Sequence, residues 1–324
     1  MNRNLFLVLL AFVMIGLSGC GSDSGVVAVV NGSVDGQENA PSATSIDYVY
    51  GIPMDETAGV ITENVADIYS SPDVKSTRLT QALYNQPVSI LQEEPGWSRV
   101  MSVDGTSGWM KLKFIDRDIS SVYGRKYTHR IIVTTRSKII TSNPSSGITQ
   151  IDAPMGSEFF SFNSTGDAYE VFLPDKKTGW IKGSGIIHIG LDEKVPVTNA
   201  DDFASTALRL KGASYLLNGM SELGIDATGL IYICARINGI DLPRSISGQL
   251  ASGIEIKPEE AQAGDLLFLA GTGEGEGETV TCAGICIGGG SYIYAGRKTG
   301  YVVVGDINKE NSEGKIIAAR RIFN

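Results

Sequence analysis

The chain has 324 residues, of which 42% are hydrophobic, and a formal net charge of −9 at pH 7. This length and apolar content are sufficient for two or three compact domains. The acidic balance, together with a sequence that has no basic stretch or arginine-rich helix, argues against nucleic acid as a partner.

The N-terminus has the pattern of an export signal. Arg3 precedes an almost unbroken apolar run over residues 5–17. A membrane span needs about 20 apolar residues, so this shorter run fits the hydrophobic region of a signal peptide. The Leu-Ser-Gly-Cys sequence at 17–20 resembles the bacterial lipobox. The resemblance implies that residues 1–20 are a lipoprotein signal and that Cys20 carries lipid; a plain signal peptide with an incidental cysteine is the alternative.

The predicted location follows from this signal. Lipidation of Cys20 implies an exported protein anchored to the cell envelope, on the outer membrane facing the periplasm in a cell that has one. Residues 21–58 are rich in Gly, Ser, Asp and Asn and show no lasting hydrophobic period. They are therefore predicted to form a flexible tether.

The next segment, residues 59–118, is predicted to form a small all-β domain. Its apolar residues fall in short alternating runs that are separated by turn signals, a pattern typical of a small barrel or sandwich. Its motifs resemble those of a bacterial SH3-like domain. They are Ile68-Tyr69-Ser70-Ser71-Pro72, Thr80-Gln81-Ala82-Leu83, Gly96-Trp97-Ser98-Arg99-Val100 and Gly108-Trp109-Met110.

A weaker copy of this unit follows. Tyr169 stands eleven residues before Trp180, much as Trp97 stands twelve before Trp109. A second SH3-like unit is therefore predicted over residues 129–190. The motif around Tyr69 resembles that of a barrel tyrosine that closes the substrate cleft in SH3-bearing relatives, which makes Tyr69 a candidate ligand-binding residue. An ordinary core tyrosine is the other explanation.

Residues 198–324 are predicted to form a domain in which helices precede strands. Phe203, Ala207 and Leu208 lie at helical spacing, which predicts a helix over 200–211. A second helix is expected to begin after Asp226 as its N-cap and to end before Gly239. Apolar strands follow, so the domain is a segregated α+β fold. The predicted fold class is two small all-β barrels followed by this α+β domain.

The C-terminal domain resembles the NlpC/P60 family of papain-like cell-wall cysteine peptidases from about residue 201 to 323. Several motifs stand in the family's order along the chain. They are Tyr215-Leu216-Leu217-Asn218-Gly219, Asp226-Ala227-Thr228-Gly229-Leu230, Leu242-Pro243-Arg244, Ala263-Gly264-Asp265-Leu266-Leu267-Phe268, Cys282-Ala283-Gly284-Ile285 and Ala318-Ala319-Arg320-Arg321.

The family's chemistry needs a cysteine at a helix N-terminus, a histidine on a facing strand and a third polar residue that orients the imidazole. The resemblance places these roles on Ala227, Cys282 and Tyr294, so all three have changed. The sequence therefore predicts a catalytically degenerate domain rather than an enzyme. Cys282 is the candidate for a relocated nucleophile, but a thiol with an ordinary pKa of about 8.5 needs a base at neutral pH. The two histidines of the chain, His129 and His188, both precede this domain.

Two polar residues flank the former nucleophile position. The resemblance implies that Asp226 and Thr228 help to hold the free amine of a cell-wall stem peptide. Capping of the helix N-terminus explains Asp226 equally well.

These observations predict a lipoprotein that binds peptidoglycan stem peptides through the degenerate domain and the SH3-like units. One alternative is a docking or regulatory partner of an active envelope hydrolase. The other is an active cysteine endopeptidase for γ-D-glutamyl-diamino acid bonds, with Cys282 as nucleophile. The expected partners are a stem peptide or other cell-wall fragment, the membrane through the N-terminal lipid, and an active envelope hydrolase. The cysteines show no metal-ligand spacing, so neither a metal nor a cofactor is expected.

Overall fold

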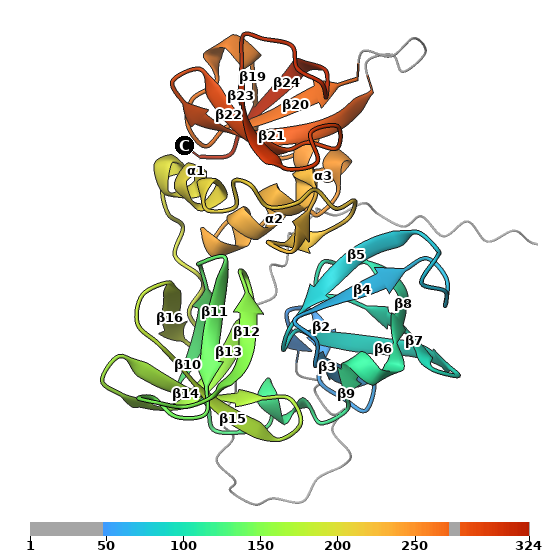
Figure 1. Ribbon diagram of the computed structural model, residues 1–324, viewed down its shortest axis with the longest axis vertical. Helices are drawn as coiled ribbons and strands as arrows, with labels where there is room; N and C mark the ends of the chain where they lie inside the picture. The colour runs from blue at the N-terminus through green and yellow to red at the C-terminus, as the bar shows by residue number, and fades with distance from the viewer. Residues whose placement is uncertain (1–47, 272–278, 324) are drawn as a thin grey trace, which may run out of the picture.

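The computed structural model describes residues 48–271 and 279–323 of the chain. Two small β-barrels lie side by side, and the C-terminal domain lies against both of them (Figure 1). The predicted signal, Cys20 and most of the predicted tether lie outside the described residues. Within the described part, no helix has the length and apolar character to cross a membrane.

The tether predicted over residues 21–58 extends too far, because its last residues, from 48 onward, have defined structure. Residues 48–58 form a short hairpin of β1 (Tyr48–Val49) and β2 (Ile52–Pro53), which leads into β3. Val49, Ile52 and Met54 are buried and pack with Phe160 of the second barrel. The stretch is too short to show a hydrophobic period, and tertiary contacts order it.

The first barrel is a seven-stranded antiparallel sheet in the order β5-β4-β8-β7-β6-β3-β9. Alternating apolar side chains such as Ile68, Val100 and Met110 fill its interior. The predicted SH3-like segment therefore forms a closed unit with its own core. Its strands are β3 (Ala58–Ile61), β4 (Val65–Tyr69), β5 (Arg78–Leu83), β6 (Pro87–Glu94), β7 (Trp97–Met101), β8 (Ser107–Lys111) and β9 (Ile115–Asp116), with 3-10 turns at Leu112–Phe114 and Ile119–Ser121.

The second barrel repeats the strand order of the first. Its sheet runs β12-β11-β15-β14-β13-β10-β16, which is the same connectivity shifted by seven strands. Its strands are β10 (His129–Val133), β11 (Ser137–Thr141), β12 (Thr149–Pro154), β13 (Glu158–Thr165), β14 (Ala168–Leu173), β15 (Lys177–Lys182) and β16 (Ile186–Gly190).

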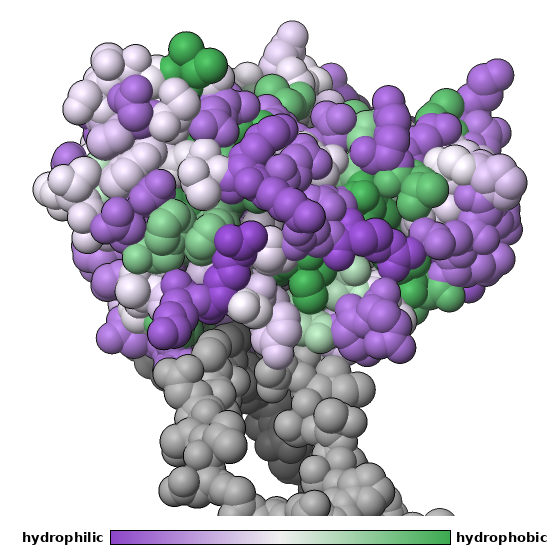
Figure 2. Space-filling view, turned by 90° about the horizontal axis from the view of Figure 1, so that it is seen from below, coloured by the Kyte–Doolittle hydropathy of each residue, from purple (hydrophilic) through white to green (hydrophobic). Residues whose placement is uncertain are grey.

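The end of the molecule that the two barrels form has a mainly hydrophilic surface, with separate apolar groups between the polar ones (Figure 2).

The C-terminal domain packs helices against one face of a six-stranded sheet, in the order β19-β24-β20-β21-β22-β23 (Figure 1). Its helices are α1 (Ala200–Leu208), α2 (Ala227–Ile237) and α3 (Ile246–Leu250), with a 3-10 turn at Pro258–Glu260. The strands are β17 (Met220–Ser221) and β18 (Gly224–Ile225), which form a separate hairpin, and β19 (Ile254–Ile256), β20 (Leu266–Ala270), β21 (Val280–Gly288), β22 (Ser291–Ala295), β23 (Val302–Asp306) and β24 (Lys315–Arg321).

Local signals explain where the two main helices begin. The side chain of Asn199 accepts a hydrogen bond from the Asp202 amide and caps α1. Asp226 caps α2 in the same way, as its position in the sequence predicts. α1 ends at Leu208, three residues before the predicted end. The predicted fold class, two small all-β barrels followed by an α+β domain, is confirmed.

A buried carboxylate ties three parts of the molecule together. Glu158 of β13 accepts a hydrogen bond from Arg236 Nη2 of α2 at 3.0 Å and another from the hydroxyl of Tyr50 in the first hairpin. Arg130 Nη1 of β10 lies 3.9 Å from the same carboxylate. Burial raises the pKa of Glu158, while the charge of Arg236 and its hydrogen bond lower it. The network fixes the second barrel and the hairpin to the core helix of the C-terminal domain.

Replacing Glu158 with glutamine tests this junction. The change leaves the buried guanidinium groups of Arg236 and Arg130 without a counter-charge, so the free energy of unfolding should fall by about 3–5 kcal/mol. Urea denaturation followed by circular dichroism measures the loss. Glu255→Gln is the matched control, because Glu255 pairs with Arg320 while its side chain is 81% exposed. Equal midpoints for the two variants would contradict the proposed role of Glu158.

Candidate functional site

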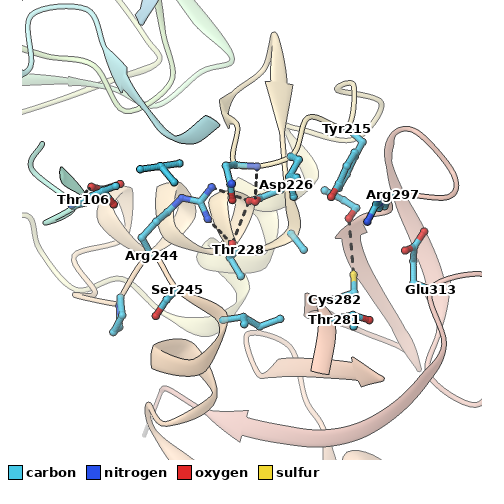
Figure 3. Close-up of a pocket in the computed structure, with 18 of the residues that line it drawn as sticks. Thr106, Tyr215, Asp226, Thr228, Arg244, Ser245, Thr281, Cys282, Arg297 and Glu313 are labelled. Atoms are coloured by element: carbon cyan, nitrogen blue, oxygen red, sulfur yellow. Dashed lines mark hydrogen bonds and ion pairs between the residues drawn. The ribbon is translucent and has the colours of Figure 1, made fainter. Parts of the chain in front are cut away.

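A cleft of about 650 Å³ lies between the C-terminal domain and the first barrel. The barrel supplies one wall, with Leu79, Asp104 and Thr106. The start of α2 and the strand β21 supply the floor and the opposite wall, with Ala227 and Cys282 (Figure 3). The site is therefore shared by two domains that are distant in sequence.

The carboxylate of Asp226 organises the start of α2. Its Oδ1 accepts hydrogen bonds from the Gly229 amide at 2.7 Å and from the Thr228 hydroxyl at 3.2 Å. Its Oδ2 accepts one from the Asn218 amide at 2.9 Å. Arg244 Nη2 lies 2.9 Å from Oδ1, and both side chains of this ion pair are buried. Asp226 therefore has several donors within the protein before any ligand arrives.

Glycine at position 229 allows the close packing around this carboxylate. A Cβ atom on Gly229 would lie 2.2 Å from the carbonyl oxygen of Gly219 and 3.0 Å from Asp226 Oδ1. Any side chain here would push the first turn of α2 away from the 215–219 segment. The Gly in the Asp-Ala-Thr-Gly-Leu motif is thus required by packing.

Arg244 connects the segment that follows α2 to the cleft floor. Its Nη1 donates to the Thr228 hydroxyl, and its Nη2 donates to the carbonyl oxygen of Gly219 at 3.2 Å. Figure 3 shows Arg244, Asp226 and Thr228 joined in one hydrogen-bonded group. Arg244 thereby occupies the polar atoms of the two residues predicted to bind a peptide amine. Their role as ligands remains a prediction.

The structure brings together the three positions to which the resemblance assigns the catalytic roles. Ala227 is the first residue of α2, Cys282 lies on β21 and Tyr294 on β22, and all three belong to one buried cluster. Tyr294 stacks on Tyr292 with 5.1 Å between the ring centroids. The methyl group of Ala227 leaves no reactive atom at the helix N-terminus.

Cys282 is the thiol that lines the cleft. It is 3% exposed, and its Sγ lies 3.9 Å from the carbonyl oxygen of Ala295. Burial raises the pKa of Cys282 to about 12, and the negative charge of Glu313 adds to the rise. The thiol is therefore protonated at neutral pH in the free protein. The other described cysteines, Cys234 and Cys286, are buried and unpaired by disulfides.

Sequence patterns did not reveal the charged residues on the strand side of the cleft. Glu313 is buried there, and its Oε1 accepts a hydrogen bond from the Lys298 amide at 2.6 Å. Arg297 and Lys298 line the same side with exposed side chains, and Tyr215 lies next to Arg297 (Figure 3). Burial raises the pKa of Tyr215, and the charge of Asp226 adds to this. Arg297, Lys298 and Glu313 lie in loops without a motif, so only the closed sheet brings them to the motif residue Tyr215.

The first barrel is clamped to the rim of the cleft by polar contacts. Arg78 Nη1 donates to the carbonyl oxygen of Leu217 at 3.2 Å, and Asn218 Nδ2 donates to the carbonyl oxygen of Arg78 at 2.6 Å. The Met220 amide donates to Gln81 Oε1 at 2.8 Å. These bonds hold strand β5 against the turn that precedes α2.

Tyr69 lies behind this wall rather than among the residues that line the cavity. Its hydroxyl donates to Asp67 Oδ2 at 2.8 Å, and Asp67 also pairs with Arg78. The ring packs edge-on against Trp97 with 6.0 Å between centroids. Tyr69 thus supports the residue that clamps the barrel, and its role as a ligand remains a prediction.

The two histidines are remote from Cys282. His129 and His188 lie on the paired strands β10 and β16 of the second barrel, with 6.1 Å between their ring centroids. Neither lines the cleft. Among residues 48–271 and 279–323, no group of three or more His, Cys, Asp or Glu side chains is placed to hold a metal ion.

Comparison with known proteins identifies both kinds of domain. Residues 212–321 match the NlpC/P60 family, and residues 64–116 match the bacterial SH3 domain. The chain carries a bacterial SH3 domain and a C-terminal NlpC/P60 domain. The predicted family resemblance is therefore confirmed for these two segments.

Individual relatives extend the similarity over most of the chain. A γ-D-glutamyl-L-lysine dipeptidyl-peptidase of Bacillus cereus is 25% identical over 255 residues, which cover 75% of this chain and 74% of the relative. A Bacillus subtilis protein of the same name is 24% identical over 305 residues, covering 87% and 90%. The crystal structure of an NlpC/P60 family protein from Bacillus cereus superposes with a TM-score of 0.72 at 21% identity, covering 82% of this chain and 100% of that one, and supports the fold.

These relatives correct the prediction that the chain is not an enzyme. That prediction rested on the loss of the cysteine at position 227, whereas the named relatives that match most of the chain are peptidases. The comparison points to a peptidase. Ala227 has no nucleophilic atom, so the residue at this position cannot itself attack a peptide carbonyl.

Exchanging Asp226 for asparagine tests how the cleft floor is held. Asparagine caps a helix about as well as aspartate, but it leaves the buried guanidinium of Arg244 without its counter-charge. The free energy of unfolding should fall by about 3–5 kcal/mol, as measured by urea denaturation. Asp201→Asn, in the exposed first turn of α1, is the control and should leave the midpoint unchanged. A silent Asp226→Asn variant would show that Asp226 acts only as a cap.

Proposed function

We propose that this protein is a cell-wall peptidase that hydrolyses γ-D-glutamyl-diamino acid bonds with Cys282 as its nucleophile. The observation that carries the proposal is the position of Cys282. It lines the cleft beside the N-terminus of α2, where Ala227 leaves the attack site without a competing side chain. The peptidase names of the relatives support the reaction class.

Glu313 is the base in this proposal. Its negative charge contributes more than that of Asp226 to the raised pKa of the Cys282 thiol, and its Oε1 is held by the Lys298 amide. Its other oxygen, Oε2, is left to accept the thiol proton as the sulfur attacks the peptide carbonyl. A general base of this kind typically contributes about 10²–10⁴-fold to the rate.

The remaining steps follow from the same residues. In this proposal the positive end of α2, at Ala227 and Thr228, and the hydroxyl of Tyr215 stabilise the negative charge that develops on the carbonyl oxygen; all three residues line the cleft. The C–N bond breaks, and the leaving amine takes the proton from Glu313. Water then hydrolyses the thioester and frees the Cys282 thiol.

The cleft lining carries three acidic residues and three basic ones, and two of the basic residues are exposed at its mouth. Asp226 is neutralised by Arg244, whereas Arg297 and Lys298 form no ion pair with any described residue. A γ-linked D-glutamyl residue keeps a free α-carboxylate, and these two exposed cations at the mouth complement it. We therefore assign the carboxylate of the glutamyl residue to the Arg297 side of the cleft.

The test compares two cysteines on the same strand. Wild-type protein should release the diamino acid from L-Ala-γ-D-Glu-L-Lys, and Cys282→Ala should abolish this release. Glu313→Gln should lower kcat by about 10²–10⁴-fold. Cys286→Ala is the control, because Cys286 is buried on β21 outside the cleft lining. The measurement is chromatography of the released lysine; full activity in Cys282→Ala, or none in the wild type, would refute the proposal.

The family implies an exported or envelope location, and we propose that a lipid on Cys20 provides the anchor. The support is the apolar run that ends in Leu-Ser-Gly-Cys at 17–20. Cys20→Ala should shift the protein from the detergent phase to the aqueous phase in Triton X-114 partitioning. Cys286→Ala, which keeps Cys20, should stay in the detergent phase. Unchanged partitioning of Cys20→Ala would rule out this anchor.

A further inference from the structure

The chain has two histidines, and the second barrel places them side by side although they are far apart in sequence. His129 begins β10, and His188 lies on the neighbouring strand β16. In the register of these strands Gly190 is the partner of His129, and Ile131 is the partner of His188. The two imidazoles therefore lie at diagonal positions on one face of the sheet, with 6.1 Å between their ring centroids.

The hydroxyl of Thr128 fixes the tautomer of one imidazole. It donates to the carbonyl oxygen of Ser161 at 3.1 Å, and the same oxygen lies 3.1 Å from His129 Nδ1. Because a hydroxyl has one hydrogen, Thr128 can only accept from His129, so Nδ1 carries the ring proton. The lone pair of Nε2 is then free in neutral His129, which is the form in which histidine binds a metal ion.

Tyr169 of β14 supports both imidazoles from one side. The centroid of its ring lies 5.1 Å from that of His188 and 6.2 Å from that of His129. Tyr169 is partly buried and packs against the core of the second barrel. The three rings therefore form one group that is anchored on the barrel core, while His188 at its edge is exposed to solvent.

The carboxylate of Glu193 brings a negative charge to the same face. Its Oε2 accepts a hydrogen bond at 2.9 Å from the amide of Gly190, the strand partner of His129. This charge attracts a cation towards the imidazoles. Within residues 48–271 and 279–323 no three His, Cys, Asp or Glu side chains are placed to enclose a metal ion. A metal at the histidines is therefore held by two protein nitrogens, and water completes its coordination.

The spacing and chemistry of the two rings suit a divalent transition metal ion. With metal–nitrogen bonds of about 2.0–2.1 Å, two imidazoles on one metal have their centroids roughly 5–6 Å apart. The observed separation of 6.1 Å is at the upper end of this range, and rotation of the exposed His188 ring closes the remainder. Imidazole nitrogens select Zn²⁺, Ni²⁺ and Cu²⁺, whereas Mg²⁺ and Ca²⁺ prefer oxygen ligands.

We propose that His129 and His188 form a binding site for a divalent transition metal ion, separate from the peptide cleft. Neither histidine lines that cleft. The metal takes the lone pair of His129 Nε2 and one nitrogen of His188, and it binds Cu²⁺ more tightly than Zn²⁺, as the general order of affinities requires. It thereby joins β10 to β16, the strand at the edge of the sheet, and stabilises the folded second barrel.

The experiment titrates full-length protein in detergent with CuCl₂, and separately with ZnCl₂, in a calorimeter. His129→Ala and His188→Ala should each raise Kd about a hundredfold, because a single imidazole loses the effective concentration that the second one provides. Thr128→Val removes the hydroxyl that fixes the tautomer and should raise Kd about tenfold. Thr128→Ser is its matched control, because it keeps the hydroxyl, and Tyr169→Phe should bind as the wild type does, because it keeps the supporting ring.

The outcomes separate a built site from scattered binding at surface groups. No heat from Cu²⁺ with the wild type, or wild-type affinity in either histidine variant, would overturn the proposal. Saturating Zn²⁺ should raise the Tm of the wild type and leave that of His188→Ala unchanged, and equal shifts in both would also overturn it. Circular dichroism of each variant excludes a folding defect. The tripeptide assay on the same variants should be unchanged, so a failure of the peptidase proposal leaves this one standing.

Discussion

The buried carboxylate of Asp226 is the interaction on which the cleft depends. It bonds to the amide of Asn218, to the first turn of α2 and to Arg244, so three chain segments meet at one side chain. Asn218 in turn reaches the backbone of Arg78 in the first barrel. Since both side chains of the Asp226–Arg244 ion pair are buried, removing either one leaves the other as a buried charge without a partner. Position and stability of the site are therefore set by the same atoms.

The features that could be predicted from the sequence were those with a local cause. The N-cap at Asp226 and the alternation of the β-strands depend on neighbouring residues, and both were predicted. The Asp226–Arg244 pair and the position of Glu313 beside Cys282 depend on how loops meet when the sheet closes, and no motif marks them. The prediction of an inactive domain rested on the alanine at position 227, and the relatives contradict that conclusion about activity. A missing side chain shows which group cannot react, and it does not show which other group does.

The two barrels show how one architecture serves two structural roles. In the first, the face that carries Tyr69 and Trp97 is filled by aromatic packing, and its edge is bonded to the C-terminal domain through Arg78 and Gln81. In the second, Glu158 makes the attachment from another strand. The two barrels are thus attached to the C-terminal domain through different strands, β5 in the first and β13 in the second.

The clamp between the first barrel and the cleft rim also sets the order of folding. Gln81 and Met220 are 139 residues apart in the chain, as are Arg78 and Leu217. Contacts of such long sequence separation form late, because the entropy of closing the intervening loop is lost before they are gained. The barrels and the C-terminal sheet can each form from nearer contacts, and the cleft exists only once they have docked. In a chain that emerges from its N-terminus, the complete site is therefore the last part of the protein to mature.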